Sequence, residues 1–210
     1  MKKEKNRGLK KGTFMFKTWL KLPILVVIVL FAGTHSYGKP NIEKMKMAPE
    51  NKKILIAYFS HSGNTREIAN QIQKNIGGEV FEIQPVKPYP QNYDSVVQQA
   101  RQELDSGYKP ALKTKVKDIR EYDIVFIGYP NWWGTIPAPV RVFLTEYDFS
   151  GKTIVPFCTH GGSGLSRSMS DIAKLCPKST MLDGLAIWGN EVGTTQTQVA
   201  EWLKKIGIMK

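Results

Sequence analysis

Short apolar runs alternate with longer segments of helical spacing from residue 52 to the end of the chain. The runs over 54–59, 123–128 and 153–158 are too short for core helices and predict strands buried on both faces, as in a parallel sheet. Residues 79–83 alternate polar and apolar positions, which indicates a strand at a sheet edge. A further strand is predicted over 182–188.

The segments between these strands have the spacing of helices. Ile68, Ile72 and Ile76 are four residues apart and predict a helix over about 64–76, which the pair Gly77-Gly78 ends. The other predicted helices cover about 93–104, Pro137 to residue 144, 165–175, and a C-terminal segment with the apolar stripe Val199, Trp202, Leu203 and Ile206.

The turn between the first strand and the first helix spans residues 60–65 and contains hydroxyl, histidine, glycine and amide side chains. Backbone N–H groups at a helix start, with the positive end of the helix dipole, make a site for a phosphate. Gly63 lets the backbone come close to a ligand, and the side-chain donors are Ser60, Ser62, Asn64 and Thr65. An ordinary capped helix start is the alternative. Because neither glycine-rich nucleotide motif is present, a monophosphate ester fits better than a triphosphate.

Two later loops also follow buried strands. Residues 129–137 hold two adjacent tryptophans between prolines, and neighbours in an extended chain point apart, so one packs down while the other is free to lie on a flat ligand. Gly134 leaves room for the backbone to approach such a ring. One buried tryptophan and one surface aromatic is the alternative. Residues 159–164 contain three glycines, which bring backbone next to a ligand at a strand end.

Residues 58–65 resemble the FMN-phosphate loop of flavodoxins and flavodoxin-like oxidoreductases, and residues 130–134 resemble the second FMN loop of short flavodoxin-like proteins. The resemblance extends from about Lys52 to the C-terminus. It implies an α/β fold, a flavodoxin-like three-layer sandwich with a five-stranded parallel sheet of order 2-1-3-4-5. It also implies FMN at the carboxyl ends of the strands.

By this resemblance the first loop holds the phosphate, the second stacks on the flavin ring and the third grips its uracil-like edge. The predicted FMN-binding residues are Ser60, His61, Ser62, Gly63, Asn64, Thr65, Pro130, Asn131, Trp132, Trp133, Gly134, Thr159, His160, Gly161, Gly162, Ser163 and Gly164. His160 is also the candidate catalytic residue, which would supply a proton or polarise a carbonyl; a hydrogen bond to the backbone is its alternative role. Tyr89 and Tyr93 either overhang the flavin or pack on the surface.

The N-terminal segment has the pattern of an export signal. Residues 1–21 hold eight Lys or Arg and one Glu, and residues 22–33 are almost wholly apolar. With small residues at Ser36 and Gly38, this pattern predicts a signal peptide over 1–38, a linker over 39–51 and the FMN-binding domain over 52–210. We therefore expect an exported protein, periplasmic or extracellular. An uncleaved membrane anchor through residues 22–38 is the alternative.

Most of the formal charge of +12 lies in this segment, because residues 39–210 hold 22 Lys and Arg against 17 Asp and Glu, a net charge of +5. The surplus is spread along the chain and does not indicate nucleic-acid binding. Export raises the question of a disulfide between Cys158 and Cys176, but a strand and the helix that returns along it would separate them by roughly 15 Å, so we expect free thiols. No cluster of His and Cys indicates a metal site.

Two functions fit an FMN site of this kind. An oxidoreductase would pass hydride or electrons from NAD(P)H or another donor to a quinone or small acceptor. The positive net charge and the compact third loop resemble such reductases. A carrier flavodoxin would exchange single electrons with protein partners. A flavin-binding module without turnover is a third reading.

Overall fold

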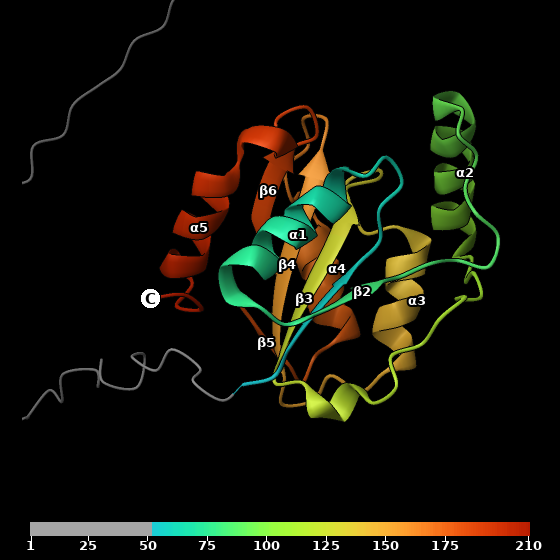
Figure 1. Cartoon of the computed structure of the whole chain (residues 1–210). Coiled ribbons are helices and arrows are strands. Elements are labelled where there is room, and N and C mark those ends of the chain that lie inside the picture. The colour runs from blue at the N-terminus through green and yellow to red at the C-terminus, as the bar shows by residue number, and fades with distance from the viewer. Residues whose placement is uncertain (1–51) are drawn as a thin grey trace, which may run out of the picture. The chain divides into compact units, whose positions relative to one another are not determined.

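The computed structural model describes residues 52–210 of the chain (Figure 1). The predicted signal peptide over 1–38 and the linker over 39–51 lie outside the described residues, so both stay predictions. Among residues 52–210, no helix combines the length and apolar character that crossing a membrane requires.

One parallel sheet of six strands forms the centre of the described part, in the order β2-β1-β3-β4-β5 with β6 also paired to β4. The three central strands are β1 (Ile54–Tyr58), β3 (Ile124–Pro130) and β4 (Thr153–His160). The outer strands are β2 (Glu79–Glu82) on one side and β5 (Thr180–Met181) with β6 (Leu185–Trp188) on the other. The predicted α/β fold and strand order are confirmed.

The strands β5 and β6 follow each other along the same edge of β4, as one interrupted strand. Thr153 pairs with Thr180, whereas His160 pairs with Trp188, so one extra residue lies between the two paired stretches. The interruption falls at Leu182–Gly184, where the prediction of a continuous strand over 182–188 is wrong. A Cβ at Gly184 would lie 2.9 Å from Met169 Sδ, so the chain passes close to the side chains of α4 there.

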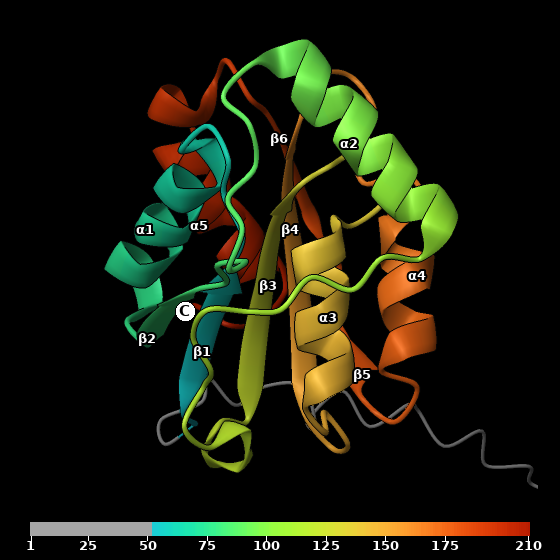
Figure 2. The same cartoon turned by 90° about the vertical axis from the view of Figure 1, so that its right-hand side faces the viewer.

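Helices cover both faces of the sheet and make the predicted three layers (Figures 1 and 2). One face carries α1 (Asn64–Ile76) and α5 (Gln196–Lys205), and the other carries α3 (Ala138–Glu146) and α4 (Ser168–Leu175). Successive residues of a strand point to opposite faces. Accordingly, Ile56 belongs to the apolar cluster of α1 and α5, whereas Leu55 belongs to the cluster of α3 and α4.

The remaining long helix, α2 (Tyr93–Ser106), lies beyond α3 and runs across the upper ends of α3 and α4 in Figure 2. It begins at Asn92, whose side chain accepts a hydrogen bond from the Ser95 N–H, and ends at Gly107 in the left-handed conformation. The helix is therefore two residues longer than predicted. It places a wall beside the carboxyl ends of β1 and β3.

The helix predicted over 165–175 begins instead at Ser168. Ser166 has a φ of +47°, which is incompatible with a helical turn, and Ser168 Oγ donates to the Leu165 carbonyl. The hydroxyl of Tyr129 donates to Ser168 Oγ at 2.7 Å and fixes this start beside β3. Cys158 and Cys176 are both buried with free thiols, and burial raises the pKa of Cys158 to about 12.

Candidate functional site

The first of three loops at the carboxyl end of the sheet connects β1 to α1. Gly63 stands at the N-cap of α1 with a φ of +93°, and no side chain caps the helix. Within residues 52–210, the backbone N–H groups of Gly63, Asn64 and Thr65 donate to no acceptor, whereas the Arg66 N–H reaches Ser60 Oγ at 3.3 Å. Uncapped N–H groups at a helix start bind anions. The three free backbone N–H groups of this loop are therefore able to bind a phosphate.

The side chains of the first loop have three different surroundings. Ser62 is exposed and its hydroxyl is accessible. Thr65 is buried, and its Oγ1 lies 2.9 Å from Oγ1 of Thr159, which is in β4 next to its end. His61 donates from Nε2 to the Pro90 carbonyl at 2.8 Å. Thr65 thus joins the first loop to the third, and His61 joins it to the segment before α2.

The second loop follows β3 and makes a tight turn at two left-handed residues. Trp132 and Thr135 exchange backbone hydrogen bonds of 3.1 Å each, and Trp133 and Gly134 between them have φ values of +54° and +76°. A Cβ at Gly134 would lie 3.1 Å from Ser166 Oγ. The glycine is therefore required by the turn and by the close approach of the segment before α4.

The two adjacent tryptophans of this loop point in different directions. Trp132 packs edge-on against Phe59 and Tyr89, with ring centroids 5.5 and 4.9 Å away. Trp133 is 46% exposed, donates from Nε1 to the Val97 carbonyl of α2 at 3.1 Å, and lies 5.2 Å below the guanidinium of Arg101. Trp132 is the tryptophan that packs down, and Trp133 is the accessible one.

Asn131 connects the second loop to the third. Its backbone N–H donates to the Thr159 carbonyl at 2.8 Å, and its side-chain amide donates to the Gly164 carbonyl at 2.6 Å. The side-chain oxygen Oδ1 is buried without a hydrogen-bond donor. A buried acceptor without a partner is costly, so this oxygen suits a ligand that carries an N–H group, as the edge of a flavin does.

The third loop extends from Thr159 to Gly164 after β4. His160 accepts the Gly162 N–H at Nδ1 over 3.0 Å, so in the neutral ring the proton is on Nε2. Burial lowers the pKa of His160, against a smaller opposing effect from Glu191. The ring packs beside Trp188 at a centroid distance of 5.1 Å. The hydrogen bond to the backbone that the sequence allowed is thus present, and Nε2–H remains as a donor.

A cavity of about 540 Å³ lies beside the first two loops. The residues that line it come from these loops and from α2 with the segment before it, namely His61, Ser62, Gln91, Tyr93, Val96, Val97, Ala100, Pro130, Asn131, Trp132 and Trp133. Tyr93 is one of them and is 78% exposed. The third loop does not line this cavity, but Asn131, which does, is hydrogen-bonded to Gly164 of that loop.

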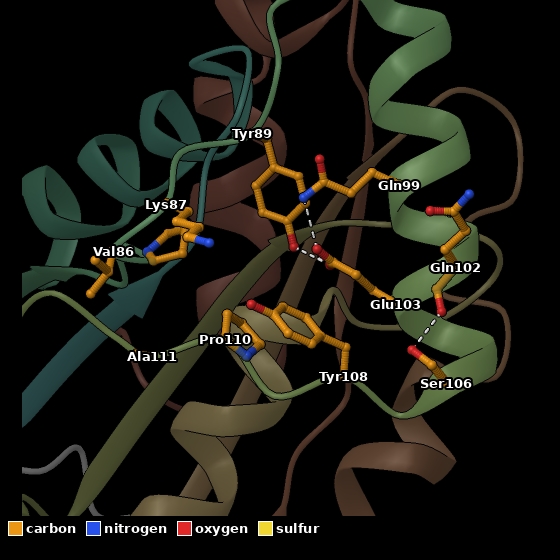
Figure 3. Close-up of a pocket in the computed structure, with 11 residues that line it drawn as sticks. Val86, Lys87, Tyr89, Gln99, Gln102, Glu103, Ser106, Tyr108, Pro110 and Ala111 are labelled. Atoms are coloured by element: carbon orange, nitrogen blue, oxygen red, sulfur yellow. Dashed lines mark hydrogen bonds between the residues drawn. The ribbon is translucent and has the colours of Figure 1, made fainter.

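A second hollow of about 370 Å³ lies between α2 and the segments 85–89 and 108–111 (Figure 3). Figure 3 shows the Tyr89 hydroxyl pointing to Glu103 of α2, to which it donates at 2.5 Å. Gln99 donates to the other carboxylate oxygen at 2.8 Å. Tyr89 is buried, so the prediction that this residue packs on the surface is wrong.

Sequence reasoning missed Glu103 and Trp188. Glu103 continues the buried stripe of Val96 and Ala100 at helical spacing. A charged residue on such a stripe indicates a buried polar contact, so the sequence could have pointed to Glu103. Trp188 is the last residue of β6, opposite His160 in register. Its position follows only from the strand pairing, which the linear sequence does not give.

Comparisons with known proteins agree with this geometry. A family model described as flavodoxin matches residues 53–206. A flavodoxin from Synechocystis sp. is 30% identical over 123 residues, covering 57% of this chain and 58% of that protein. A flavodoxin from Haemophilus influenzae is 28% identical over 105 residues, covering 48% and 46%. The chain spans about half the length of the curated relatives it matches.

Solved structures extend the similarity. A Bacteroides eggerthii protein described as a flavoprotein is 33% identical, with a TM-score of 0.66 over 74% of this chain and 98% of that one. A Lactobacillus acidophilus flavoprotein solved in complex with FMN is 23% identical, with a TM-score of 0.58 over 68% and 97% of the two chains. The second likeness supports the fold.

Proposed function

The chain belongs to the flavodoxin family of FMN-binding redox proteins, and we propose that it is an oxidoreductase that passes electrons through FMN to a quinone or similar small acceptor. The observation that carries the proposal is the cavity of about 540 Å³ between the second loop and α2. Its wall of Val96, Val97 and Ala100 is apolar and suits a small planar molecule. FMN bound over the second loop would fill part of this cavity, so a carrier needs room for FMN alone, whereas the oxidoreductase also needs room for an acceptor between the ring and α2.

The FMN phosphate would be held by the first loop. The free N–H groups of Gly63, Asn64 and Thr65 and the accessible Ser62 hydroxyl are its donors. Hydrogen bonds to a charged group contribute about 1.5–3 kcal/mol each, so several of them can hold a dianion without a lysine or arginine.

The flavin ring would lie over the second loop, with its polar edge against the third. Asn131 Oδ1, buried without a donor, would accept from a ring N–H. The N–H groups of Gly161, Ser163 and Gly164, which donate to no residue within 52–210, would face the ring carbonyls. The remaining predicted FMN-binding residues of the three loops stay in this proposal.

Bound FMN supplies the capacity to take a hydride from NAD(P)H and to return two electrons to an acceptor. The role of the protein is to orient both molecules and to place hydrogen-bonding groups beside them. A quinone that takes up two electrons also takes up two protons, and the Nε2–H of His160 could donate a hydrogen bond that polarises a carbonyl of the acceptor. His160 is the candidate catalytic residue on this basis.

A carrier of single electrons is the second candidate. Trp133 and Trp188 are each 46% exposed beside the second and third loops, which suits the approach of a protein partner. The curated relatives are named flavodoxin, and both functions use the same cofactor site.

Kinetics of the FMN-loaded domain over 39–210 distinguish the two. Steady oxidation of NAD(P)H that requires a quinone supports the oxidoreductase. A reductive titration in two separate one-electron stages, with no quinone-dependent turnover, supports the carrier. Replacing Val97 with Phe would fill the cavity, and the oxidoreductase hypothesis expects KM for the quinone to rise while flavin absorbance is retained.

We further propose that the protein is exported, on the basis of residues 1–38, and that it takes up FMN outside the cytoplasm. Cell fractionation with N-terminal sequencing tests this. A cleaved start near residue 39 in the exported fraction supports it, and a protein confined to the cytosol contradicts it.

A further inference from the structure

A hollow of about 430 Å³ between α3 and α4 carries charge that the cofactor site does not use. The two helices lie side by side in Figure 2. The polar residues that line the hollow are Arg141 of α3 and Arg167, Asp171 and Lys174 of α4 and its start; Ile136 and Leu175 form an apolar part of the wall. Three cations therefore surround one carboxylate.

The Arg141 side chain lacks a hydrogen-bond partner. Its Nε is buried without an acceptor, and within residues 52–210 the guanidinium forms no hydrogen bond or ion pair. Burial lowers the pKa of Arg141, which reflects the cost of its desolvation. An unpaired buried guanidinium N–H is expensive, so this group is prepared for an acceptor from outside.

The two nearest carboxylates are already engaged elsewhere. Glu103 accepts from Tyr89 and Gln99. Asp171 accepts from Thr135 Oγ1 at 2.6 Å and forms ion pairs with Arg167 and Lys174 at 3.4 and 3.6 Å. Neither comes within hydrogen-bonding distance of Arg141, so internal pairing does not satisfy this residue.

The cations converge because of helix geometry. Arg167, Asp171 and Lys174 are four and three residues apart and so share one face of α4. Arg141 lies in the first turns of α3 and faces them across the hollow. Arg167 and Lys174 keep exposed side chains that can move toward a ligand, whereas Arg141 is half-buried and its Nε is fully buried.

We propose that this hollow binds a small organic anion, whose carboxylate or phosphate group is held by Arg141, Arg167 and Lys174 and whose apolar body packs on Ile136 and Leu175. The planar guanidinium of Arg141 matches either oxyanion in a bidentate arrangement. This ligand is separate from FMN, because the hollow does not include the first loop. Thr135 and Arg167 connect it to the second loop, since the Arg167 N–H donates to the Gly134 carbonyl at 3.1 Å.

The test follows the Nε–H resonance of Arg141 by NMR in the domain over 39–210 with excess FMN, so that the phosphate site of the first loop is filled. Phenyl phosphate and benzoate are the anionic probes, and benzyl alcohol is the neutral control. We expect one or both anions to shift the resonance saturably at or below about 1 mM. A shift by phenyl phosphate alone identifies a phosphate ester, and a shift by benzoate identifies a carboxylate.

Substitutions inside and outside the hollow give a matched comparison. Calorimetry measures the affinity of each variant for the anionic probe. Arg141→Gln should weaken binding of the anion about 10- to 100-fold, the effect of losing a charge-assisted hydrogen bond. Lys174→Gln, on the surface, should weaken it less. Arg120→Gln removes the same charge from an exposed arginine paired with Asp118 outside the hollow and should leave binding unchanged.

Three results would overturn the proposal: no response to either anion, an equal response to benzyl alcohol, or native affinity in Arg141→Gln. Flavin absorbance reports the first loop separately. A domain that lacks FMN but binds the anion at Arg141 would contradict the proposed function and leave this inference intact.

Discussion

The hydroxyl oxygens of Thr65 and Thr159 lie 2.9 Å apart and join the start of α1 to the last residues of β4. Both residues are buried. When two hydroxyls share one hydrogen bond, one of the two O–H groups is used between them and the other remains a donor. The pair therefore holds the first and third loops together.

Replacing Thr65 with Val tests this contact. We expect a loss of about 1–3 kcal/mol in the free energy of unfolding, because Thr159 is left buried without its partner. We also expect a rise of about 10-fold in the Kd of FMN. Urea denaturation and flavin fluorescence titration measure the two effects.

The double variant Thr65→Val with Thr159→Val is the control for that experiment. Removing both hydroxyls leaves no orphaned partner, so stability should largely return while FMN affinity stays low. Native FMN affinity in the single variant would remove Thr65 from the phosphate site.

Changing Gly134 to Ala should distort the second loop. Its φ of +76° is unfavourable for a residue with a Cβ, and that Cβ would lie 3.1 Å from Ser166 Oγ. We expect a cost of about 1–2 kcal/mol in stability and weaker FMN binding, measured as above. Gly193→Ala is the matched control, since a Cβ there meets nothing within 4 Å. Equal effects at the two glycines would contradict this role for the turn.

Much of the fold could be predicted from the sequence because local patterns determined it. The buried strands carry continuous apolar runs, and Ile68, Ile72 and Ile76 mark one face of α1. The strand order, in contrast, was implied by the resemblance to flavodoxins. The interruption at Leu182–Gly184 was missed because it appears as a one-residue change in the pairing of β5 and β6 with β4, which the linear sequence does not give.

The candidate site was predictable to a similar extent. The three loops meet because they follow strands that are adjacent in the sheet. The different orientations of Trp132 and Trp133 depend on α2, whose position no local pattern encodes. For the same reason, the pairing of Tyr89 with Glu103 became visible only in three dimensions.

The stability of the domain should depend on pH through His160. Burial lowers the pKa of this residue in the folded state, so the unfolded chain binds the proton first as the pH falls below about 6.5. The contribution of His160 to stability is then fully present above that pH and is lost as the pH falls through the folded pKa.

His160→Gln should flatten the dependence of Tm on pH between about 5 and 7. His61→Gln leaves His160 in place and is the matched control; an unchanged slope in His160→Gln would exclude this source.

Removing the hydroxyl of Tyr89 should lower the free energy of unfolding, because it removes a buried hydrogen bond. Figure 3 shows this hydroxyl directed at Glu103, and Tyr89→Phe would leave that buried carboxylate with only Gln99 as donor. We expect the free energy of unfolding to fall by about 1.5–3 kcal/mol, the usual range for a hydrogen bond to a charged group, measured by urea denaturation.

Tyr108→Phe is the control because Tyr108 lines the same hollow but is 46% exposed, so its free energy of unfolding should change by no more than about 0.5 kcal/mol. If Glu103→Gln abolished the difference between Tyr89 and Phe at this position, the charge of Glu103 would be the cause. A persistent difference would instead assign the effect to the hydrogen bond of the Tyr89 hydroxyl, independent of the charge on residue 103.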